Sequence, residues 1–265
     1  SDHNIFEVVS EQCKKLRIQN PVISNEDLVK IKYIEHSDYK AVSIGTLYAV
    51  EKGHNGLEAA LDQMVVDIEK AVDEGANILI LSDRGVSSEN APIPMLLACS
   101  HAHHGLKKLK KRSSFGIIIE SAEPREPHHF SLLFGYGASA INPYMVNEII
   151  AHQVETGVIK GISVEKAISN FNKAIAKGIV KVMNKIGIST LHSYRGAQIF
   201  EALGLNEKFI DTYFCKTATR IEGIGLYEIE KEISRRFHRA YSLKNNPSMA
   251  LEIGGDYRWR RDGEK

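Results

Sequence analysis

The feature that most constrains the fold is an alternation, between residues 41 and 156, of short apolar runs with segments of helical periodicity. The apolar runs lie at 41–50, 77–81, 115–119 and 138–141. Helical segments follow them at 57–72, about 93–111, 125–134 and 146–156. Short continuous apolar runs are typical of strands buried on both faces of a parallel sheet. Four such strand–helix units predict an α/β fold with parallel strands and right-handed crossovers.

The strand pattern stops near Asn142, whereas a closed barrel of this type needs eight units. We therefore expect an incomplete (βα) barrel-like domain with additional C-terminal helices. These helices are predicted over 163–187, 196–203 and 206–214, and around the stripe from Leu226 to Phe237. The predicted organisation is a linker with a short helix at 1–40, the α/β domain at 41–241 and a further linker at 242–265.

Composition excludes several classes of function. Lys+Arg 34 against Asp+Glu 33 gives a net charge of +1, which argues against nucleic acid or an acidic membrane surface as partner. The sequence contains no run of 18 apolar residues, so it predicts no membrane-spanning helix. The three cysteines, Cys13, Cys99 and Cys215, are too few and too widely spaced for a disulfide framework, so we expect a cytoplasmic protein. The chain begins with Ser1 and ends in a polar stretch, which suggests a piece of a longer protein.

Charged residues follow two of the predicted strands at the point where each strand ends. Asp83 and Arg84 follow the run at 77–81, and Glu120 follows the run at 115–119. Ligands of α/β folds bind at the carboxyl ends of strands, so these three residues are candidates for binding a polar ligand or for acid–base chemistry. A buried charge at a strand end also needs a partner, and pairing among the three is the favoured interpretation.

The remaining motifs predict structural roles. His101, His103 and His104 fall inside a predicted helix, where the side chains of residues i and i+2 point apart. His128-His129 supplies no third ligand to the same site, so a metal site is disfavoured. Gly223-Ile224-Gly225 follows no buried strand and reads as a tight turn rather than a phosphate cradle. Cys99 lies among apolar neighbours and is predicted to be a core residue. The basic run 107–112 suits a solvated helix end.

Two long stretches of the chain resemble the central domain of the glutamate synthase large (alpha) subunits. The first runs over 56–61, 75–85 and 91–94, and the second, which contains SYRGAQIFEALGL, over 177–190 and 193–205. Shorter matches in the same order occur at 20–24, 126–130, 135–138, 142–144 and 254–264. The resemblance covers nearly the whole chain, and it implies a degenerate copy of an FMN-linked oxidoreductase barrel.

The resemblance implies a place in a larger enzyme that makes two glutamates from glutamine and 2-oxoglutarate. An amidotransferase domain with an N-terminal cysteine would release ammonia, and an FMN domain with a 3Fe-4S cluster would reduce the 2-iminoglutarate. This chain would join the two domains and help enclose the ammonia tunnel, carrying no catalytic, cofactor-binding or metal residue itself. Its partners would be the adjacent domains, with a small subunit or ferredoxin as the electron donor of the full enzyme. NADPH, NADH and ferredoxin all stay open.

Small and polar residues are concentrated just after the long predicted helix, and we expect the segment from Lys185 to Gln198 to face the flavin domain or the tunnel. The alternative is that Ser189-Thr190 only caps and turns the chain. The residues considered for an interdomain or tunnel role are Asp83, Arg84, Glu120, Lys185, Ser189, Ser193, Arg195 and Gln198. The competing functional hypothesis is a free-standing barrel-like enzyme that uses Asp83, Arg84 and Glu120.

Overall fold

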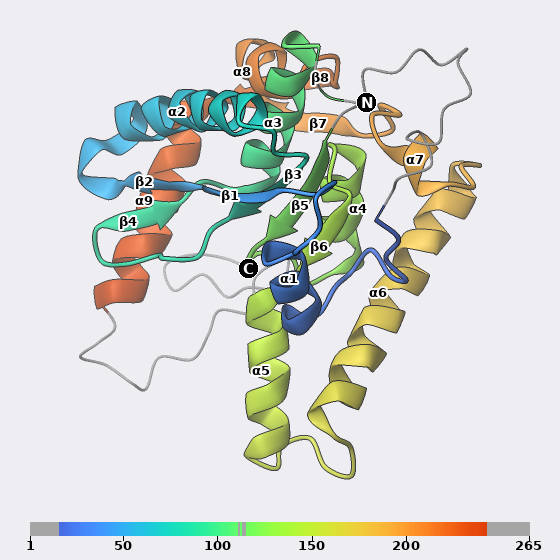
Figure 1. Cartoon of the computed structure of the whole chain (residues 1–265). Helices are drawn as coiled ribbons and strands as arrows, with labels where there is room; N and C mark the ends of the chain where they lie inside the picture. The colour runs from blue at the N-terminus through green and yellow to red at the C-terminus, as the bar shows by residue number, and fades with distance from the viewer. Residues whose placement is uncertain (1–15, 111, 113–114, 243–265) are drawn as a thin grey trace, which may run out of the picture.

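An open parallel sheet lies at the centre of the computed structural model, which describes residues 16–110, 112 and 115–242 (Figure 1). Its strand order is β1-β3-β5-β6, and each neighbouring pair is parallel. These strands are β1 (Ala41–Gly45), β3 (Ile78–Ser82), β5 (Gly116–Glu120) and β6 (Ala140–Asn142). The predicted α/β class with parallel strands is confirmed. The order follows the chain, as it would in part of a barrel, but the sheet stays open.

Three helices cover one face of this sheet. They are α2 (Gly53–Asp73), α3 (Met95–Lys108) and α4 (Pro127–Gly135), each of which follows a strand along the chain (Figure 1). Successive residues of a strand point to opposite faces, so Leu79, Leu81, Ile117 and Ile119 all enter the core beneath these helices. The predicted strand–helix alternation thus buries one continuous apolar face.

The opposite face of the sheet is covered by the N-terminal helix α1 (Asn25–Lys32). Leu28 and Ile31 of this helix pack against Ile80 and Ile118 in a second apolar cluster. The preceding backbone continues the sheet, because Val22 forms a parallel bridge beside β6. In a closed barrel this face would point to the interior. Residues 22–32 therefore pack on the face of the sheet opposite to α2, α3 and α4.

The single strand predicted at 41–50 is two strands in the structure. β1 ends at Gly45, and β2 (Leu47–Ala49) pairs antiparallel with β4 (Asn90–Pro92) outside the main sheet. Between them Thr46 donates its N–H to Ser82 at 2.8 Å and accepts from Ile93 at 2.9 Å. Thr46 thus connects the central sheet to the β2–β4 pair, and the single apolar run contributes one strand to each. A short 3-10 helix, η2 (Val50–Lys52), leads into α2.

Two helices follow β6 directly, as predicted, but the first of them does not return along the sheet. Figure 1 shows α5 (Tyr144–Glu155) extending away from the strands, with α6 (Val164–Lys185) running back beside it. The hydroxyl of Ser163 caps α6 by accepting the N–H of Lys166. The buried residues Ile175, Ile179 and Met183 lie in the C-terminal half of α6, which packs against α4. The second half of α6 thus completes the helical layer.

The helix predicted at 196–203 is wrong. Two left-handed residues, Gly196 (φ 72°) and Gln198 (φ 56°), interrupt any helix there. The chain instead forms strand β7 (Glu201–Leu205), which pairs parallel with β8 (Ala218–Ile224), so the strand pattern does not stop near Asn142. The short helices α7 (Leu191–Tyr194) and α8 (Glu207–Tyr213) flank β7.

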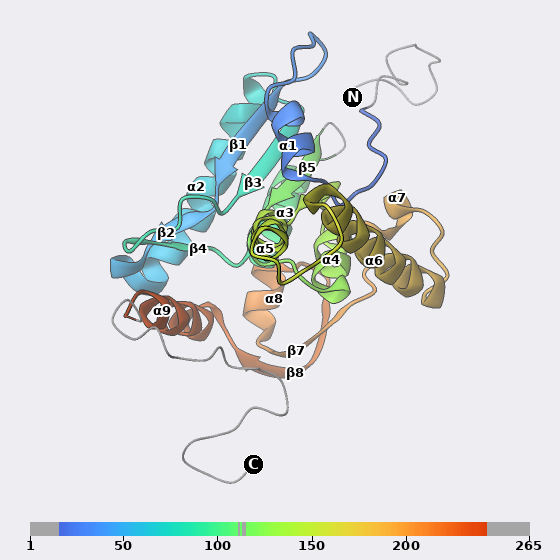
Figure 2. The same cartoon turned by 90° about the horizontal axis from the view of Figure 1, so that it is seen from below.

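The last described helix, α9 (Leu226–Ser242), fastens this C-terminal part to the N-terminal half. Its buried Glu230 accepts hydrogen bonds from Tyr48 at 3.2 Å and from Ser234 at 2.6 Å. Figure 2 shows α9 lying beside β2 and β4. None of the helices in the described ranges has the length and apolarity of a bilayer-spanning segment. The predicted linker at 242–265, apart from Ser242, lies outside the described residues, as does Cys13.

Candidate functional site at the carboxyl edge of the sheet

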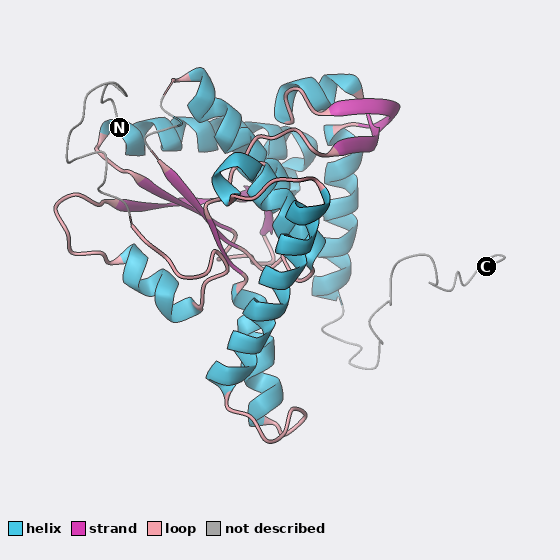
Figure 3. Ribbon diagram, turned by 90° about the vertical axis from the view of Figure 1, so that its right-hand side faces the viewer, coloured by secondary structure: helices cyan, strands magenta, loops and turns pink. Residues whose placement is uncertain are grey.

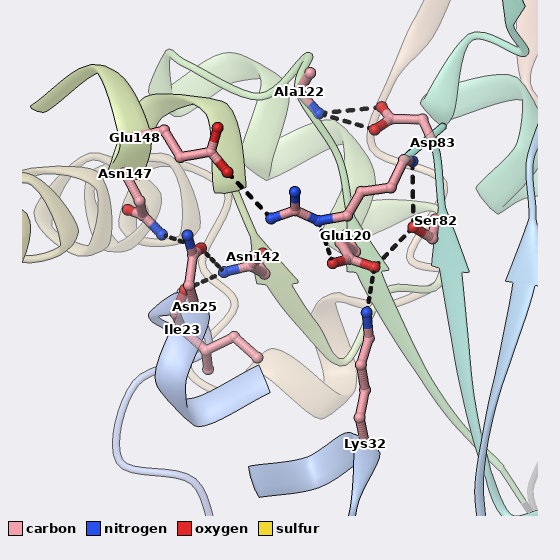
Figure 4. Close-up of polar contacts among 11 residues, drawn as sticks. Ile23, Asn25, Lys32, Ser82, Asp83, Glu120, Ala122, Asn142, Asn147 and Glu148 are labelled. Atoms are coloured by element: carbon pink, nitrogen blue, oxygen red, sulfur yellow. Dashed lines mark hydrogen bonds and ion pairs between the residues drawn. The ribbon is translucent and has the colours of Figure 1, made fainter. Parts of the chain in front are cut away.

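Glu120 is the centre of a polar cluster at the carboxyl edge of the sheet (Figure 4). Its carboxylate is 2% exposed and accepts hydrogen bonds from Lys32 at 2.8 Å, Ser82 at 2.7 Å and Arg84 at 2.7 Å. Burial alone would raise its pKa, but the bonds from Lys32, Ser82 and Arg84 hold the pKa of Glu120 below its ordinary value. Glu120 is therefore a charged, fully paired carboxylate.

Asp83 is also buried, but its partners are not charged. Ser121 Oγ donates to it at 2.5 Å, and the backbone N–H of Ala122 donates to both carboxylate oxygens at 3.0 and 3.2 Å. A hydrogen bond from Tyr144 adds a further donor. Burial raises the pKa of Asp83 above its ordinary value, against the effect of these donors. Its local role is to fix the turn that leaves β5.

Arg84 joins the strand ends to α5. Its Nε atom binds Glu120, and its Nη2 atom contacts Glu148 at 3.3 Å. The guanidinium also lies over the ring of Tyr144, 3.9 Å from the centroid, in a cation–π contact. The sequence predicted that Asp83, Arg84 and Glu120 would lie at one edge of the sheet, with pairing among the three as the favoured role. Arg84 and Glu120 do form a pair, whereas Asp83 is held by Ser121 and Ala122 instead.

A second set of side chains closes the same edge beneath α1. Asn142 Nδ2 donates to the carbonyl of Ile23 at 3.1 Å and to Asn25 Oδ1 at 2.9 Å, and Asn147 Nδ2 donates to the same Asn25 oxygen at 3.0 Å. The Oδ1 atoms of Asn142 and Asn147 are buried without a protein partner. These bonds hold the start of α1 over the end of β6 and the first turn of α5.

The other predicted interdomain residues lie at the opposite edge. Arg195 donates to the hydroxyl of Ser139, which immediately precedes β6, at 2.9 Å. Its Nη2 atom lies 3.1 Å from His192 Nδ1. Lys185, Ser189, Ser193 and Gln198 are exposed in the same segment. A five-residue strand is about 16 Å long, so the predicted residues form two separate groups rather than one site.

The alternative reading of Ser189-Thr190 as a cap is confirmed in part. Thr190 is the N-cap of α7, and its Oγ1 atom accepts the N–H of Ser193 at 3.3 Å. Ser193 then has its hydroxyl 2.9 Å from Thr190 Oγ1. The exposed Gln198 adopts a left-handed φ of 56°, which is uncommon for a residue with a side chain.

His101, His103 and His104 lie in α3, a helix as predicted, whereas His128 and His129 lie in α4. His103 Nδ1 accepts a hydrogen bond from Arg112 Nε at 2.8 Å. Burial and the charge of Arg112 lower the pKa of His103 to about 3, so its ring is neutral. Arg112 also donates to the carbonyls of Phe115 and Gly137, which ties α3 to β5 and β6. In the described ranges, no group of three or more His, Cys, Asp or Glu side chains is placed to hold a metal ion.

Two further predictions concern small residues. Cys99 is fully buried, as expected of a core cysteine, and burial raises its pKa to about 12. Gly223 was predicted to lie in a tight turn, which is wrong, because it lies within β8. A Cβ atom at Gly223 would collide with the carbonyl oxygen of Gly204, so a glycine is needed for the two strands to approach.

A cleft of about 310 Å³ lies close to the same carboxyl edge, between α4 and α9. Its apolar lining includes Leu96 and Leu132, and its charged lining includes Glu123, Arg125 and Arg236. Glu123 accepts the backbone N–H of Met95 at 2.9 Å and so also caps the start of α3. The sequence had singled out none of these residues, since the helices that bring them together are far apart in the chain.

Lys32, Tyr144 and Glu148 are likewise missing from the residues predicted for the carboxyl edge. Lys32 has no local signal, because it reaches Glu120 only after α1 has packed on the inner face of the sheet. Tyr144 and Glu148 are one turn apart on α5, directly after the end of β6, and this i, i+4 spacing was the available signal.

Comparison with known proteins places the chain in a family. The family model described as "Glutamate synthase central domain" matches residues 1–206. The chain is 43% identical over 251 residues to the NADPH glutamate synthase large chain of Bacillus subtilis, which covers 95% of this chain and 16% of that protein. It is 38% identical over 266 residues to the NADH glutamate synthase of Schizosaccharomyces pombe, and this match covers 99% of this chain and 13% of that protein.

The ferredoxin-dependent glutamate synthase of Pyropia yezoensis is 32% identical over 271 residues, covering 96% of this chain and 17% of that protein. Among solved structures, a flavocytochrome b2 double variant with sulfite bound matches with a TM-score of 0.41 and 12% identity, covering 70% of this chain and 46% of that chain. The chain thus spans only 13–17% of the length of these curated relatives. By its sequence, this protein belongs to the glutamate synthase central-domain family.

Proposed function

We propose that this chain is the connecting domain of a glutamate synthase large chain, an enzyme that makes two glutamates from glutamine and 2-oxoglutarate. In this role it joins the amidotransferase domain to the FMN domain and helps enclose the path of ammonia between them. The observation that carries the proposal is the pattern of coverage. Nearly all of this chain aligns with glutamate synthases, yet it spans less than a fifth of their length.

The polar cluster at the carboxyl edge supports a non-catalytic role for this chain. Glu120 and Arg84 neutralise one another, and Asp83 is occupied by Ser121 and Ala122. A general acid or base must reach a substrate proton, and side chains engaged in this way hold the fold together instead. The free-standing enzyme that would use these three residues is therefore the less favoured function.

The proposal assigns FMN and the 3Fe-4S cluster to other parts of the enzyme. Helix α1 fills the face of the sheet that would enclose a barrel ligand, and Lys32 closes the carboxyl edge above it. A cluster needs several thiolates together, whereas Cys99 is buried in the core and Cys215 is exposed. The electron donor would be a nicotinamide cofactor, acting through a small subunit, or ferredoxin, and the setting would be cytoplasmic.

The segment from Lys185 to Gln198 is the part of this chain that we propose to face the flavin domain or the tunnel. Its polar side chains are exposed at the amino edge of the sheet, and Gln198 is held in an uncommon backbone conformation. Backbone strain of this kind persists only where the surroundings hold it, and it gathers at sites that bind or switch. Arg195 anchors the segment to the sheet through Ser139.

The test is to substitute Arg195→Ala and Gln198→Ala in the full-length synthase and to measure glutamine hydrolysed per 2-oxoglutarate consumed. We expect this ratio to rise in both variants, because ammonia released by the amidotransferase escapes before it is used. Arg235→Ala, a change at an exposed arginine of α9, is the control and leaves the ratio unchanged. An unchanged ratio in the Arg195 and Gln198 variants would show that this segment plays no part in coupling.

A further inference from the structure

The small β7–β8 sheet carries a pair of exposed apolar side chains. Leu203 of β7 and Ile221 of β8 are opposite one another in the strand register. Their exposed fractions are 67% and 62%, among the highest of the large apolar residues in the described chain. Directly opposed residues have Cβ atoms about 5 Å apart, so the two side chains form one patch. Glu201 and Arg220, an exposed ion pair at 3.6 Å, flank it.

This exposure is unusual for parallel strands, which are normally covered on both faces. One side of the pair is covered by the domain itself, where Ala202 and Leu205 pack against the main core. Along β8, every residue except Thr219 is exposed, whichever face of the strand it lies on. Figure 3 shows the pair at the periphery of the molecule, away from the central sheet, and Figure 2 shows the same position from below.

Both strands of this two-stranded sheet are edge strands, and natural proteins avoid leaving apolar edge strands exposed, because other chains pair with them. Val66 of α2 offers a contrast within the same molecule. It is 55% exposed, but it stands among Gln63, Asp67 and Lys70, and a single exposed valine of this kind is ordinary. Leu203 and Ile221 differ because they adjoin one another on neighbouring strands, and the described chain leaves both side chains more than 60% exposed.

We propose that the Leu203–Ile221 face is the docking surface for an apolar strip on another domain of the same polypeptide. The inference rests on the proposed function, because it requires that this chain is one part of a longer synthase. The curated relatives are about six to eight times as long as this chain, so their remaining sequence is long enough to form such a domain.

The size of the patch favours a tethered domain over a second copy. A stable interface between separate molecules buries roughly 1,200 Å² or more, which two side chains and their immediate neighbours do not provide. A domain joined covalently is present at a high effective concentration and needs far less contact area to stay docked. The flanking Glu201–Arg220 pair gives the patch a polar border of the kind that surrounds interface cores.

The experiment measures the accessibility of three engineered cysteines in the full-length synthase. Leu203→Cys, Ile221→Cys and the matched control Val66→Cys are each treated with a maleimide, and the rate of modification is followed by peptide mass spectrometry. In this structure all three positions are more than half exposed. We expect at least a tenfold slower reaction at positions 203 and 221 than at position 66. Equal rates would overturn the proposal.

A second measurement needs no substitution. Hydroxyl-radical footprinting of the unmodified full-length protein compares oxidation of Leu203 and Ile221 with that of Val66. Protection of both strand residues supports the docked face even if a cysteine variant fails to fold, and oxidation matching that of Val66 contradicts it.

The identity of the occupant is tested by a photo-crosslinker placed at position 221 of the full-length chain. A crosslink to a domain outside these 265 residues, at a yield independent of protein concentration, supports the proposal. A crosslink between two copies that grows with concentration, or one to residues 243–265, overturns it. The outcome is separate from the coupling ratio measured for Arg195 and Gln198, so either proposal can fail alone.

Discussion

The central sheet and the β7–β8 pair are both built from parallel strands, yet their side chains meet opposite surroundings. All five residues of β3 are buried, whereas β8 is exposed along nearly its whole length. Each strand of the central sheet is followed by a helix, and three of these helices pack over one face, while α1 closes the other (Figure 1). The β7–β8 pair has only the short helix α8 between its strands.

The difference lies in whether segments of this chain cover the faces of each sheet. The central sheet is complete within this chain, since its apolar faces and its charged strand ends all find partners here. The β7–β8 pair packs Ala202 and Leu205 of β7 against the main core and leaves nearly all of β8 exposed. If the comparison is right, substitutions in the central sheet affect the stability of this chain, and substitutions on the outer face of β7–β8 affect its contacts.

The largest effect is expected from Leu79→Ala in β3. Leu79 is fully buried, so the substitution leaves a cavity and lowers the free energy of unfolding by about 2–5 kcal/mol. The matched change Leu203→Ala removes a side chain that is 67% exposed and costs less than about 0.5 kcal/mol. Urea denaturation of the two variants checks the contrast. Similar losses at both positions would remove the distinction between the sheets.

A smaller effect is expected from Glu120→Gln, which leaves Lys32 and Arg84 without their carboxylate. Those two side chains are 24% and 44% exposed, so the loss at pH 7 is about 2–3 kcal/mol, below the 3–5 kcal/mol of a deeply buried pair. Glu148→Gln is the control, because the Glu148 side chain is 49% exposed and its contact with Arg84 contributes little.

The Glu120 effect also has a defined pH dependence. The pKa of Glu120 is lowered in the folded chain, so its stabilising contribution is complete above the ordinary value of 4.5 and is lost as the pH falls through the folded pKa. The difference in unfolding free energy between the unmodified chain and Glu120→Gln should therefore shrink between pH 5 and pH 2. A constant difference over that range would mean that the carboxylate charge is not the stabilising feature.

The smallest global effect is expected from Gly223→Ala in β8. The added methyl group would collide with the carbonyl oxygen of Gly204, and the two exposed strands can separate to relieve it, at a cost of about 1 kcal/mol. Hydrogen exchange should quicken in 201–205 and 218–224 while the amides of β3 and β5 stay protected. Gly45→Ala in β1 is the control, since its added Cβ meets nothing within 4 Å.

The central strands could be predicted closely from the chain alone. The runs at 77–81 and 115–119 differ from β3 and β5 by one residue, because a strand buried on both faces must be apolar throughout. The 196–203 segment could not be predicted in the same way. Its strand forms through pairing with residues 218–224, which are distant in the sequence. The left-handed backbone conformations of Gly196 and Gln198 prevent a helix there, and such conformations are not encoded by the residue types alone.

The candidate site shows the same division. Asp83, Arg84 and Glu120 were predicted to lie together because parallel strands end at one edge of a sheet, and they do. The separation of this group from Arg195 could not be foreseen, since nothing in the local pattern states which edge of the sheet the segment after α6 reaches. The contact between Arg195 and Ser139 places it at the amino edge.

By itself, the sequence determined the fold class, the buried strands of the central sheet and the family to which the chain belongs. Each of these depends on runs of neighbouring residues, which carry their own signal. Only the tertiary structure decided that α1 covers the second face of the central sheet, that Lys32 reaches Glu120, and that Leu203 and Ile221 are exposed side by side. Those features depend on which distant segments meet, and that is settled by packing of the whole chain rather than by any one stretch of it.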